Sequence, residues 1–291
     1  MKTMKTHRTI TRRNFLQTGL LGSTALAVAS LPGTTEAAVT KAARDPFHGL
    51  KLGMASYSLR KFTLDQAIVM TKQAGLRYIN LKDMHLSFKS TTAERQEARR
   101  KIEAAGLSLV GGGVIYLDNK PDEIRARFEY ARDAGMPTIV CSPEPAAMDT
   151  VEKMVKEFDI RIAIHNHGPG DNRYPSPMDV WRMVKDRDLR MGLCMDIGHT
   201  VRIGEDPVAA FEQCASRMYD LHVKDVTQPT AKGEGTEMGK GVIDIVAFLR
   251  TLVRHNYPNH VGLEYEANAD APMPGIIESV AYMRGVLAAI D

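Results

Sequence analysis

Short apolar runs alternate with amphipathic segments along most of the chain, and this alternation constrains the fold more than any other feature. Eight apolar runs span residues 50–57, 78–81, 108–114, 138–141, 161–165, 191–196, 218–223 and 260–265. Eight segments with helical patterns span residues 64–74, 92–105, 122–134, 149–158, 178–186, 207–217, 244–255 and 275–290. When each strand is followed by a helix, the strands pair in parallel and the helices form the crossover connections between them. Eight such units predict an α/β fold, a (β/α)8 TIM barrel formed as one domain by residues 49–291.

Local signals support these helices and strands. Thr91 and Glu94 have the spacing of a capping box, which marks the start of a helix. Glycines stand where C-terminal helix caps belong, just before a strand, at Gly75, Gly106 and Gly135. An open, doubly wound sheet is the alternative, but it usually has fewer strands, and no Gly-x-Gly-x-x-Gly loop follows the first run. The glycines at 111–113 therefore indicate close backbone packing and not a nucleotide cradle.

The first residues predict an export signal. Residues 11–16, Thr-Arg-Arg-Asn-Phe-Leu, have the pattern of a twin-arginine signal. The weakly apolar run that follows, 19–31, is shorter than the roughly 20 apolar residues that span a membrane. Small residues around Ala37 suit a signal peptidase. We expect a signal peptide at 1–37, a linker at 38–48, a periplasmic location and no stable membrane insertion; a disordered basic tail is the alternative.

The charge of the chain argues against a nucleic-acid partner once the signal is set aside. The whole chain has a net charge of +3, and residues 1–37 contain five basic residues and one acidic residue. The rest of the chain therefore has a net charge of −1, without the basic face that a phosphate backbone requires. The three cysteines, an odd number without metal-ligand spacing, are interpreted as buried core residues.

Polar side chains gather at the predicted carboxyl ends of the strands, where a TIM barrel has its active site. From the fourth strand to the eighth they are Glu144; His165, Asn166 and His167; Asp196 and His199; His222, Lys224 and Asp225; Glu264 and Glu266. Alone, any of them could be a satisfied structural group. Converging acidic groups, however, repel each other and lose hydration unless a cation joins them. The pattern predicts one divalent metal ion, for which Mn²⁺, Co²⁺, Mg²⁺ and Zn²⁺ are all suitable.

Four segments at these strand ends resemble the sugar phosphate isomerase/epimerase family, whose members have a xylose isomerase-like barrel. The segments are IHNHG at 164–168, MDIGH at 195–199, LHVKD at 221–225 and GLEYE at 262–266. The resemblance implies that Asp196, His222 and Glu264 are metal ligands. Many members have a ligating glutamate where this chain has His165. We therefore expect Glu144 as the fourth ligand, with His165 as the alternative.

The resemblance also implies removal of a proton next to a sugar carbonyl, with a metal ion stabilising the resulting enediolate. The candidate catalytic residues are His165, His167, Lys224 and Glu264. For Lys224, a structural salt bridge to Asp225 is the alternative. The candidate substrate-binding residues are Tyr57, Asn166, His199 and Glu266, with Arg60 and Trp181 as further contacts. His199 could instead orient Asp196.

Three fates of an enediolate correspond to three activities. Reprotonation gives an isomerase or an epimerase, which is the expected activity, acting on an unphosphorylated sugar because sugar phosphates are cytoplasmic. Expulsion of a neighbouring group gives the alternative, a lyase that removes the aglycone of a 3-keto-glycoside. His165 in place of a glutamate argues against a symmetrical pair of glutamates for epimerisation. A non-catalytic periplasmic sugar-binding protein and an abasic-site endonuclease are the other classes. The sequence leaves a homo-oligomer open.

Overall fold

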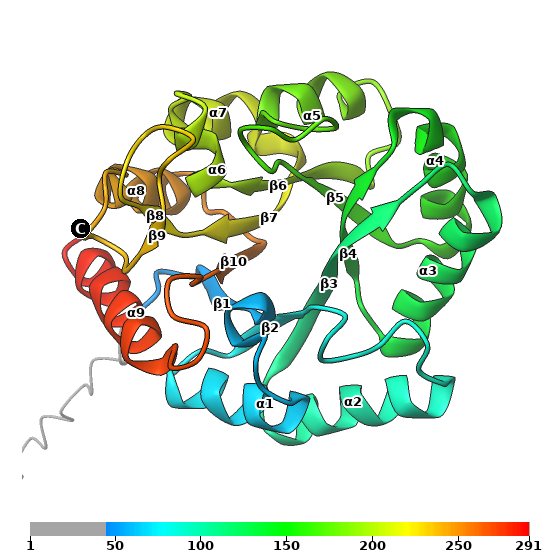
Figure 1. Cartoon of the computed structure of the whole chain (residues 1–291), viewed down its shortest axis with the longest axis horizontal. Coiled ribbons are helices and arrows are strands. Elements are labelled where there is room, and N and C mark those ends of the chain that lie inside the picture. The colour runs from blue at the N-terminus through cyan, green and yellow to red at the C-terminus, as the bar shows by residue number, and fades with distance from the viewer. Residues whose placement is uncertain (1–44, 291) are drawn as a thin grey trace, which may run out of the picture. The chain divides into compact units, whose positions relative to one another are not determined.

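The computed structural model describes residues 45–290, and they form a closed barrel of eight parallel strands with helices around the outside (Figure 1). The barrel strands are β1 (Lys51–Ala55), β2 (Tyr78–Leu81), β3 (Ser108–Leu117), β4 (Thr138–Pro143), β5 (Arg161–His165), β6 (Met191–Asp196), β7 (Met218–Val223) and β10 (His260–Leu263). Each strand pairs with its neighbours in chain order, and β10 closes the barrel against β1. The predicted TIM barrel is confirmed.

The helices lie on the outer side of the barrel strands (Figure 1). They are α1 (Leu64–Gln73), α2 (Thr92–Ala104), α3 (Pro121–Ala134), α4 (Met148–Phe158), α5 (Pro177–Val184), α6 (Ile197–Arg202), α7 (Pro207–Cys214), α8 (Ile245–Arg254) and α9 (Met273–Ala288), with 3-10 turns at Ser56–Leu59, Pro145–Ala147 and Ala215–Arg217. Along residues 45–290, no helix is both long and apolar enough to cross a membrane. The predicted signal peptide at 1–37 and most of the predicted linker lie outside the described residues.

The structure differs from the sequence-based description in three places. Strand β3 runs to Leu117, three residues beyond the predicted end, so that Tyr116 belongs to the rim. The short helix α6 follows β6 directly. A small antiparallel hairpin, β8 (Asp225–Val226) with β9 (Gly235–Thr236), follows β7. All three lie next to the carboxyl ends of barrel strands, so they shape the rim and leave the barrel unchanged.

The predicted capping box is present at the start of α2. The hydroxyl of Thr91 accepts a hydrogen bond from the backbone N–H of Glu94, whose carboxylate accepts one from the N–H of Thr91. These bonds satisfy backbone donors that have no partner within the first turn of α2. Gly113 shows why the third strand needs glycine: a Cβ atom there would lie 1.9 Å from the carbonyl oxygen of Val140 on β4. The predicted close backbone packing is confirmed.

Buried polar side chains also hold the barrel together. Arg217, 7% exposed, donates hydrogen bonds to four carbonyl oxygens of the 185–191 segment that leads into β6. The three cysteines are free and buried, as predicted.

Candidate metal centre and active site

Four side chains that can bind a metal meet at the carboxyl end of the barrel. They come from β5, β6, β7 and the residue after β10, four strands that are neighbours in the barrel. The potential ligand atoms of His165, Asp196, His222 and Glu264 all lie within 4.8 Å of one another. These four residues are between 0% and 7% exposed. Parallel strands bring their carboxyl ends to one rim, which is why residues 99 positions apart in sequence can form one cluster.

The internal distances of the cluster are those of hydrogen bonds and ion pairs. The Nε2 atom of His165 lies 3.0 Å from Nδ1 of His222 and 3.5 Å from Oδ2 of Asp196. Nδ1 of His222 lies 3.3 Å from Oε2 of Glu264. The four groups therefore form a chain in which two neighbouring imidazoles lie between two carboxylates.

Lys224, one residue after β7, neutralises the carboxylates. Its Nζ atom lies 2.9 Å from Oδ2 of Asp196 and 2.6 Å from Oε2 of Glu264, and it also contacts Oε1 of Glu266. The alternative of a salt bridge between Lys224 and Asp225 is not what the structure shows. The carboxylate of Asp225 accepts backbone hydrogen bonds instead, from Val226, Gly239, Gly241 and Ile243. Asp225 thus fixes the loop that follows the β8–β9 hairpin.

The charges around the carboxylates set their ionisation. Burial opposes the charge of Asp196, but His199 and Lys224 hold the pKa of its carboxyl well below the usual value. Burial also opposes the charge of Glu264, but His222 and Lys224 keep its pKa well below the usual value. Both carboxyls are therefore ionised at neutral pH, which is the form that binds a cation.

The imidazoles respond to their surroundings in opposite ways. Burial lowers the pKa of His165 well below its usual value. Burial has the same sign at His222, but Cys194 and Glu264 outweigh it and hold the pKa of His222 well above the usual value. Burial also lowers the pKa values of His167 and His199. His165, His167 and His199 are therefore neutral at neutral pH.

Asn166 holds the cluster in place from within the protein. Its side-chain oxygen accepts a hydrogen bond from the N–H of Asp196 at 2.9 Å, and its amide donates to the hydroxyl of Thr200 at 3.2 Å. Asn166 is fully buried. Oδ1 of Asp196 in turn accepts a hydrogen bond from the N–H of His199 and so caps α6. These bonds use the polar atoms of Asn166 within the protein and leave none facing the pocket, so the structure does not support the predicted substrate contact.

The structure places Glu144, the expected fourth ligand, outside the cluster. The carboxylate of Glu144 accepts a hydrogen bond from the N–H of Asn119 at 2.8 Å and faces Arg173. Its side chain is 40% exposed and does not join the metal-type cluster. Glu144 is displaced because β4 ends at Pro143, and the chain then turns into the 3-10 helix at 145–147. His165, the alternative, lies in the cluster with Asp196, His222 and Glu264.

A pocket of about 260 Å³ opens above the cluster. Its lining contains Tyr57, Lys82, Val114, Tyr116, His165, His167, His199, Glu264 and Glu266. Most of the predicted catalytic and substrate-binding residues are thus brought together, while Trp181 packs against the core and is not part of the lining. Sequence reasoning missed Lys82, Val114 and Tyr116. The continuing apolar run Val114-Ile115-Tyr116-Leu117 is the signal that would have extended β3 to the rim.

Two tyrosines flank this pocket, each with an arginine against its ring. The guanidinium of Arg173 lies 5.4 Å from the ring centre of Tyr116, and that of Arg60 lies 4.8 Å from the ring centre of Tyr57. Tyr116 is also stacked with His167, with 5.8 Å between ring centres. Tyr116 is 55% exposed, which leaves its ring accessible at the mouth of the pocket. Aromatic rings held in this way suit the apolar faces of a sugar ring.

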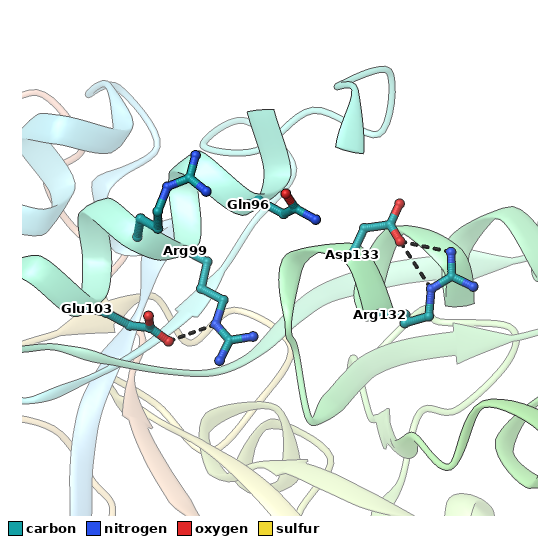
Figure 2. Close-up of a pocket in the computed structure, with 6 residues that line it drawn as sticks. Gln96, Arg99, Glu103, Arg132 and Asp133 are labelled. Carbon is teal, nitrogen blue, oxygen red and sulfur yellow. Dashed lines mark hydrogen bonds and ion pairs between the residues drawn. The ribbon is translucent and has the colours of Figure 1, made fainter. Parts of the chain in front are cut away.

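A larger hollow of about 510 Å³ lies away from this rim, between α2 and α3, and it has a different character (Figure 2). Its charged side chains pair with one another, Arg99 with Glu103 and Arg132 with Asp133. The potential metal-binding groups among residues 45–290 lie at the barrel rim and not in this hollow. Volume alone therefore does not identify the site.

The rim residues fit a divalent ion. Two imidazoles and two carboxylates are a suitable donor set. Three buried atoms of the cluster have no hydrogen-bonding partner among residues 45–290, namely Nδ1 of His165, Oδ2 of Asp196 and Nε2 of His222. Lys224 is close to Oδ2 of Asp196, but not in the direction of a hydrogen bond. A buried acceptor without a partner is costly, and a bound cation would satisfy it.

The fold and the rim define a (β/α)8 barrel with a buried polar cluster at the carboxyl ends of its strands. The chain belongs to the xylose isomerase-like TIM barrel family, whose profile matches residues 68–286. The family resemblance found in the sequence is confirmed.

Comparisons with individual proteins agree with this assignment. An inosose dehydratase of Clostridium beijerinckii is 22% identical over 261 residues, covering 80% of this chain and 82% of that protein. The structure of 3-keto-D-glucoside 4-epimerase YcjR from E. coli has a TM-score of 0.65 at 16% identity, covering 81% of this chain and 99% of the other. A probable 3-DHS dehydratase, AsbF from Bacillus anthracis, has a TM-score of 0.64 at 12% identity, covering 80% and 98%. At these identities the structural matches show the shared fold alone.

Proposed function

We propose that this chain is a divalent-metal-dependent enzyme that removes the proton next to the carbonyl of an unphosphorylated keto-sugar and then expels a group from the neighbouring carbon. The observation that carries the proposal is the buried cluster of His165, Asp196, His222 and Glu264 beneath a pocket flanked by aromatic rings. The predicted export of the chain supports a substrate without phosphate. The names of the dehydratase relatives support the elimination, because a dehydratase expels water.

The proposed substrate lies in the pocket with its ring against Tyr116 or Tyr57. A divalent ion held by the four cluster residues would stabilise negative charge on the substrate oxygens. Asn166 keeps Asp196 in position through its hydrogen bond to the backbone. A pocket of about 260 Å³ limits the water that can surround the reacting carbons.

His167 is the proposed proton carrier. It lines the pocket and is neutral at neutral pH, because burial lowers its pKa. In a 3-keto-glycoside the carbonyl is at C3 and the leaving group is at C1. A neutral imidazole can accept the proton from C2 of this substrate, and the electrons of that C–H bond form the enediolate. When the carbonyl re-forms, the bond from C1 to the leaving oxygen breaks and a C1–C2 double bond forms. His167 then returns its proton to that oxygen, so that the products are an unsaturated ketone and a free alcohol.

The roles of Glu264 and Lys224 differ from those expected for a free base and a free cation. The carboxylate of Glu264 contacts both Lys224 and His222, which weakens it as a base. Lys224 is held by three carboxylates and is 6% exposed, so it does not reach an oxyanion in the pocket without leaving them. We therefore assign Glu264 the role of a metal ligand, and Lys224 the role of neutralising the carboxylates.

An isomerase or epimerase is the second candidate. In an isomerase His167 could return the proton to the neighbouring carbon, whereas an epimerase needs a second group on the opposite face, and Glu266 lines the same pocket as His167. The fold shared with a 3-keto-D-glucoside 4-epimerase is compatible with this activity.

One experiment separates these candidates. The protein, loaded with Mn²⁺, is incubated in D₂O with 3-keto-glucosides and with free ketoses and aldoses, and the products are followed by NMR and mass spectrometry. Release of the aglycone with formation of an enone supports the lyase. Deuterium at the α-carbon of an isomerised sugar without release supports the isomerase or epimerase. Sugar binding without exchange or products, in a protein that binds no divalent ion, would instead identify a non-catalytic binding protein.

A further inference from the structure

The ammonium group of Lys224 occupies the carboxylate side of the candidate metal site. It contacts Oδ2 of Asp196 and Oε2 of Glu264. Oδ2 of Asp196 is also the oxygen nearest to His165, and Oε2 of Glu264 is the oxygen nearest to His222. The lysine therefore lies against the same two oxygens that a divalent ion would use.

The position of this lysine is built into the fold. Lys224 is 6% exposed, and its stem passes over Gly198 at the start of α6. A Cβ atom at position 198 would lie 2.5 Å from Cγ of Lys224, so a larger residue there would collide with the stem. The glycine of the Asp-Ile-Gly-His segment thus leaves room for the lysine to reach the cluster.

An ammonium group and a divalent ion compete for these oxygens. A metal lies about 2.0–2.2 Å from a carboxylate oxygen, whereas Nζ of Lys224 lies 2.6 Å from Glu264. Two cations held by the same pair of oxygens repel each other strongly in a buried site. Glu266 offers another place, because its carboxylate contacts Lys224, is 36% exposed and is outside the four-residue cluster.

We propose that Lys224 is an internal counter-cation, which stabilises Asp196 and Glu264 when the site holds no metal and is transferred to Glu266 when a divalent ion binds. The inference rests on the proposed metal site and adds a residue that controls its affinity. Lys224 keeps the empty site folded and the bound ion exchangeable. Removing the lysine is expected to strengthen metal binding, whereas removing the acceptor carboxylate of Glu266 is expected to weaken it.

The test measures Mn²⁺ affinity by calorimetry in the wild type and in Lys224→Met, Glu266→Gln and the double variant. We expect Lys224→Met to bind Mn²⁺ at least about tenfold more tightly, since the competing charge is gone. Glu266→Gln is expected to bind Mn²⁺ more weakly. This loss of affinity is expected to be smaller when Lys224 is also replaced, because no displaced lysine then needs the carboxylate at position 266. Lys101→Met is the control, because Lys101 pairs with Asp65 between α2 and α1, away from the cluster.

The outcomes distinguish the inference from the function on which it rests. If the wild type binds Mn²⁺ and Lys224→Met binds it no more tightly, the counter-cation role is wrong and the metal site stands. If neither protein binds a divalent ion, the metal site and the exchange are both wrong. Should Lys224→Met not fold, Lys224→Gln takes its place, and an undiminished effect of Glu266→Gln in that background also rejects the proposal. Thermal unfolding adds a second measure, because Mn²⁺ is expected to raise the Tm of the lysine variant more than that of the wild type.

Discussion

The Nε2 atom of His165 lies 3.0 Å from the Nδ1 atom of His222, so that a hydrogen bond joins β5 to β7 across β6 at the barrel rim. Only one of the two nitrogen atoms can donate the proton. The pKa of His165 is lowered by burial, and that of His222 is raised by Cys194 and Glu264 against the effect of burial. His222 is therefore the donor and His165 the acceptor. This pair places the imidazole of His165 where the family resemblance implies a carboxylate.

The first prediction concerns the fourth metal ligand. His165→Ala is expected to lower the affinity for Mn²⁺ by about tenfold or more, because it removes one of four clustered donors. Glu144→Gln is the matched control and is expected to change the affinity by less than about threefold, since Glu144 contacts Asn119 and Arg173. Calorimetric titration of the purified variants checks both values. A large loss of Mn²⁺ affinity in Glu144→Gln, with none in His165→Ala, would instead support Glu144 as the fourth ligand.

The second prediction concerns the aromatic wall of the pocket. Tyr116→Ala is expected to raise KM for the sugar substrate by about three- to tenfold with little change in kcat, because ring stacking contributes about 0.5–1.5 kcal/mol. Tyr116→Phe keeps the ring and is expected to retain the wild-type KM. Steady-state kinetics on the substrate found in the D₂O experiment supply the measurement. Equal defects in the two variants would assign the effect to the hydroxyl group, which lies 3.4 Å from His167.

The third prediction concerns stability. Arg217→Met is expected to lower the free energy of unfolding by about 3 kcal/mol or more, because it leaves several buried carbonyl oxygens without a donor. Arg254→Met removes an arginine whose side chain is 62% exposed and pairs with Glu212. That control is expected to cost less than about 1 kcal/mol. Denaturant unfolding of both variants gives the comparison, and similar losses would contradict a structural role specific to Arg217.

The fourth prediction concerns the pH dependence of stability through His85. Its Nε2 atom faces the carbonyl oxygen of Leu59 and must carry a proton, so Nδ1 accepts a hydrogen bond from the hydroxyl of Ser56. The N–H of Lys82 donates to that same hydroxyl, which fixes its direction. Burial lowers the pKa of His85, against the effect of the Leu59 hydrogen bond. The folded state therefore favours the neutral ring.

The sign of the effect follows from this shift. A histidine whose pKa is lower in the folded state destabilises the fold as the pH falls below its unfolded value of about 6.5. The free energy of unfolding of the wild type is expected to decrease between pH 7.5 and pH 5. His85→Gln is expected to be less stable at pH 7.5 but to lose less stability over this range. Urea unfolding at both pH values measures the difference, and an identical loss in the two proteins would refute the assignment.

Much of the fold could be predicted because its signals are local. Apolar runs of strand length, capping residues such as Thr91 and glycines such as Gly135 depend on a few neighbouring residues. The regular alternation of eight apolar runs with eight amphipathic segments then predicted the barrel. The end of β3 and the six-residue helix α6 were missed, since each is set by contacts with residues distant in sequence. Tyr116 reaches the rim because β3 pairs with β4 as far as Leu117, and α6 starts because Asp196 caps it.

The same division applies to the site. The sequence by itself determined that Asp196, His222 and Glu264 would gather at one rim, because consecutive parallel strands of a barrel end on the same side. Only the tertiary structure decided that His165 completes the cluster, that Glu144 leaves it, and that Lys224 neutralises its carboxylates. The spacing of residues along a chain gives the strand on which a side chain lies. Its direction and its partners depend on the packing of strands and loops that meet only when the barrel closes.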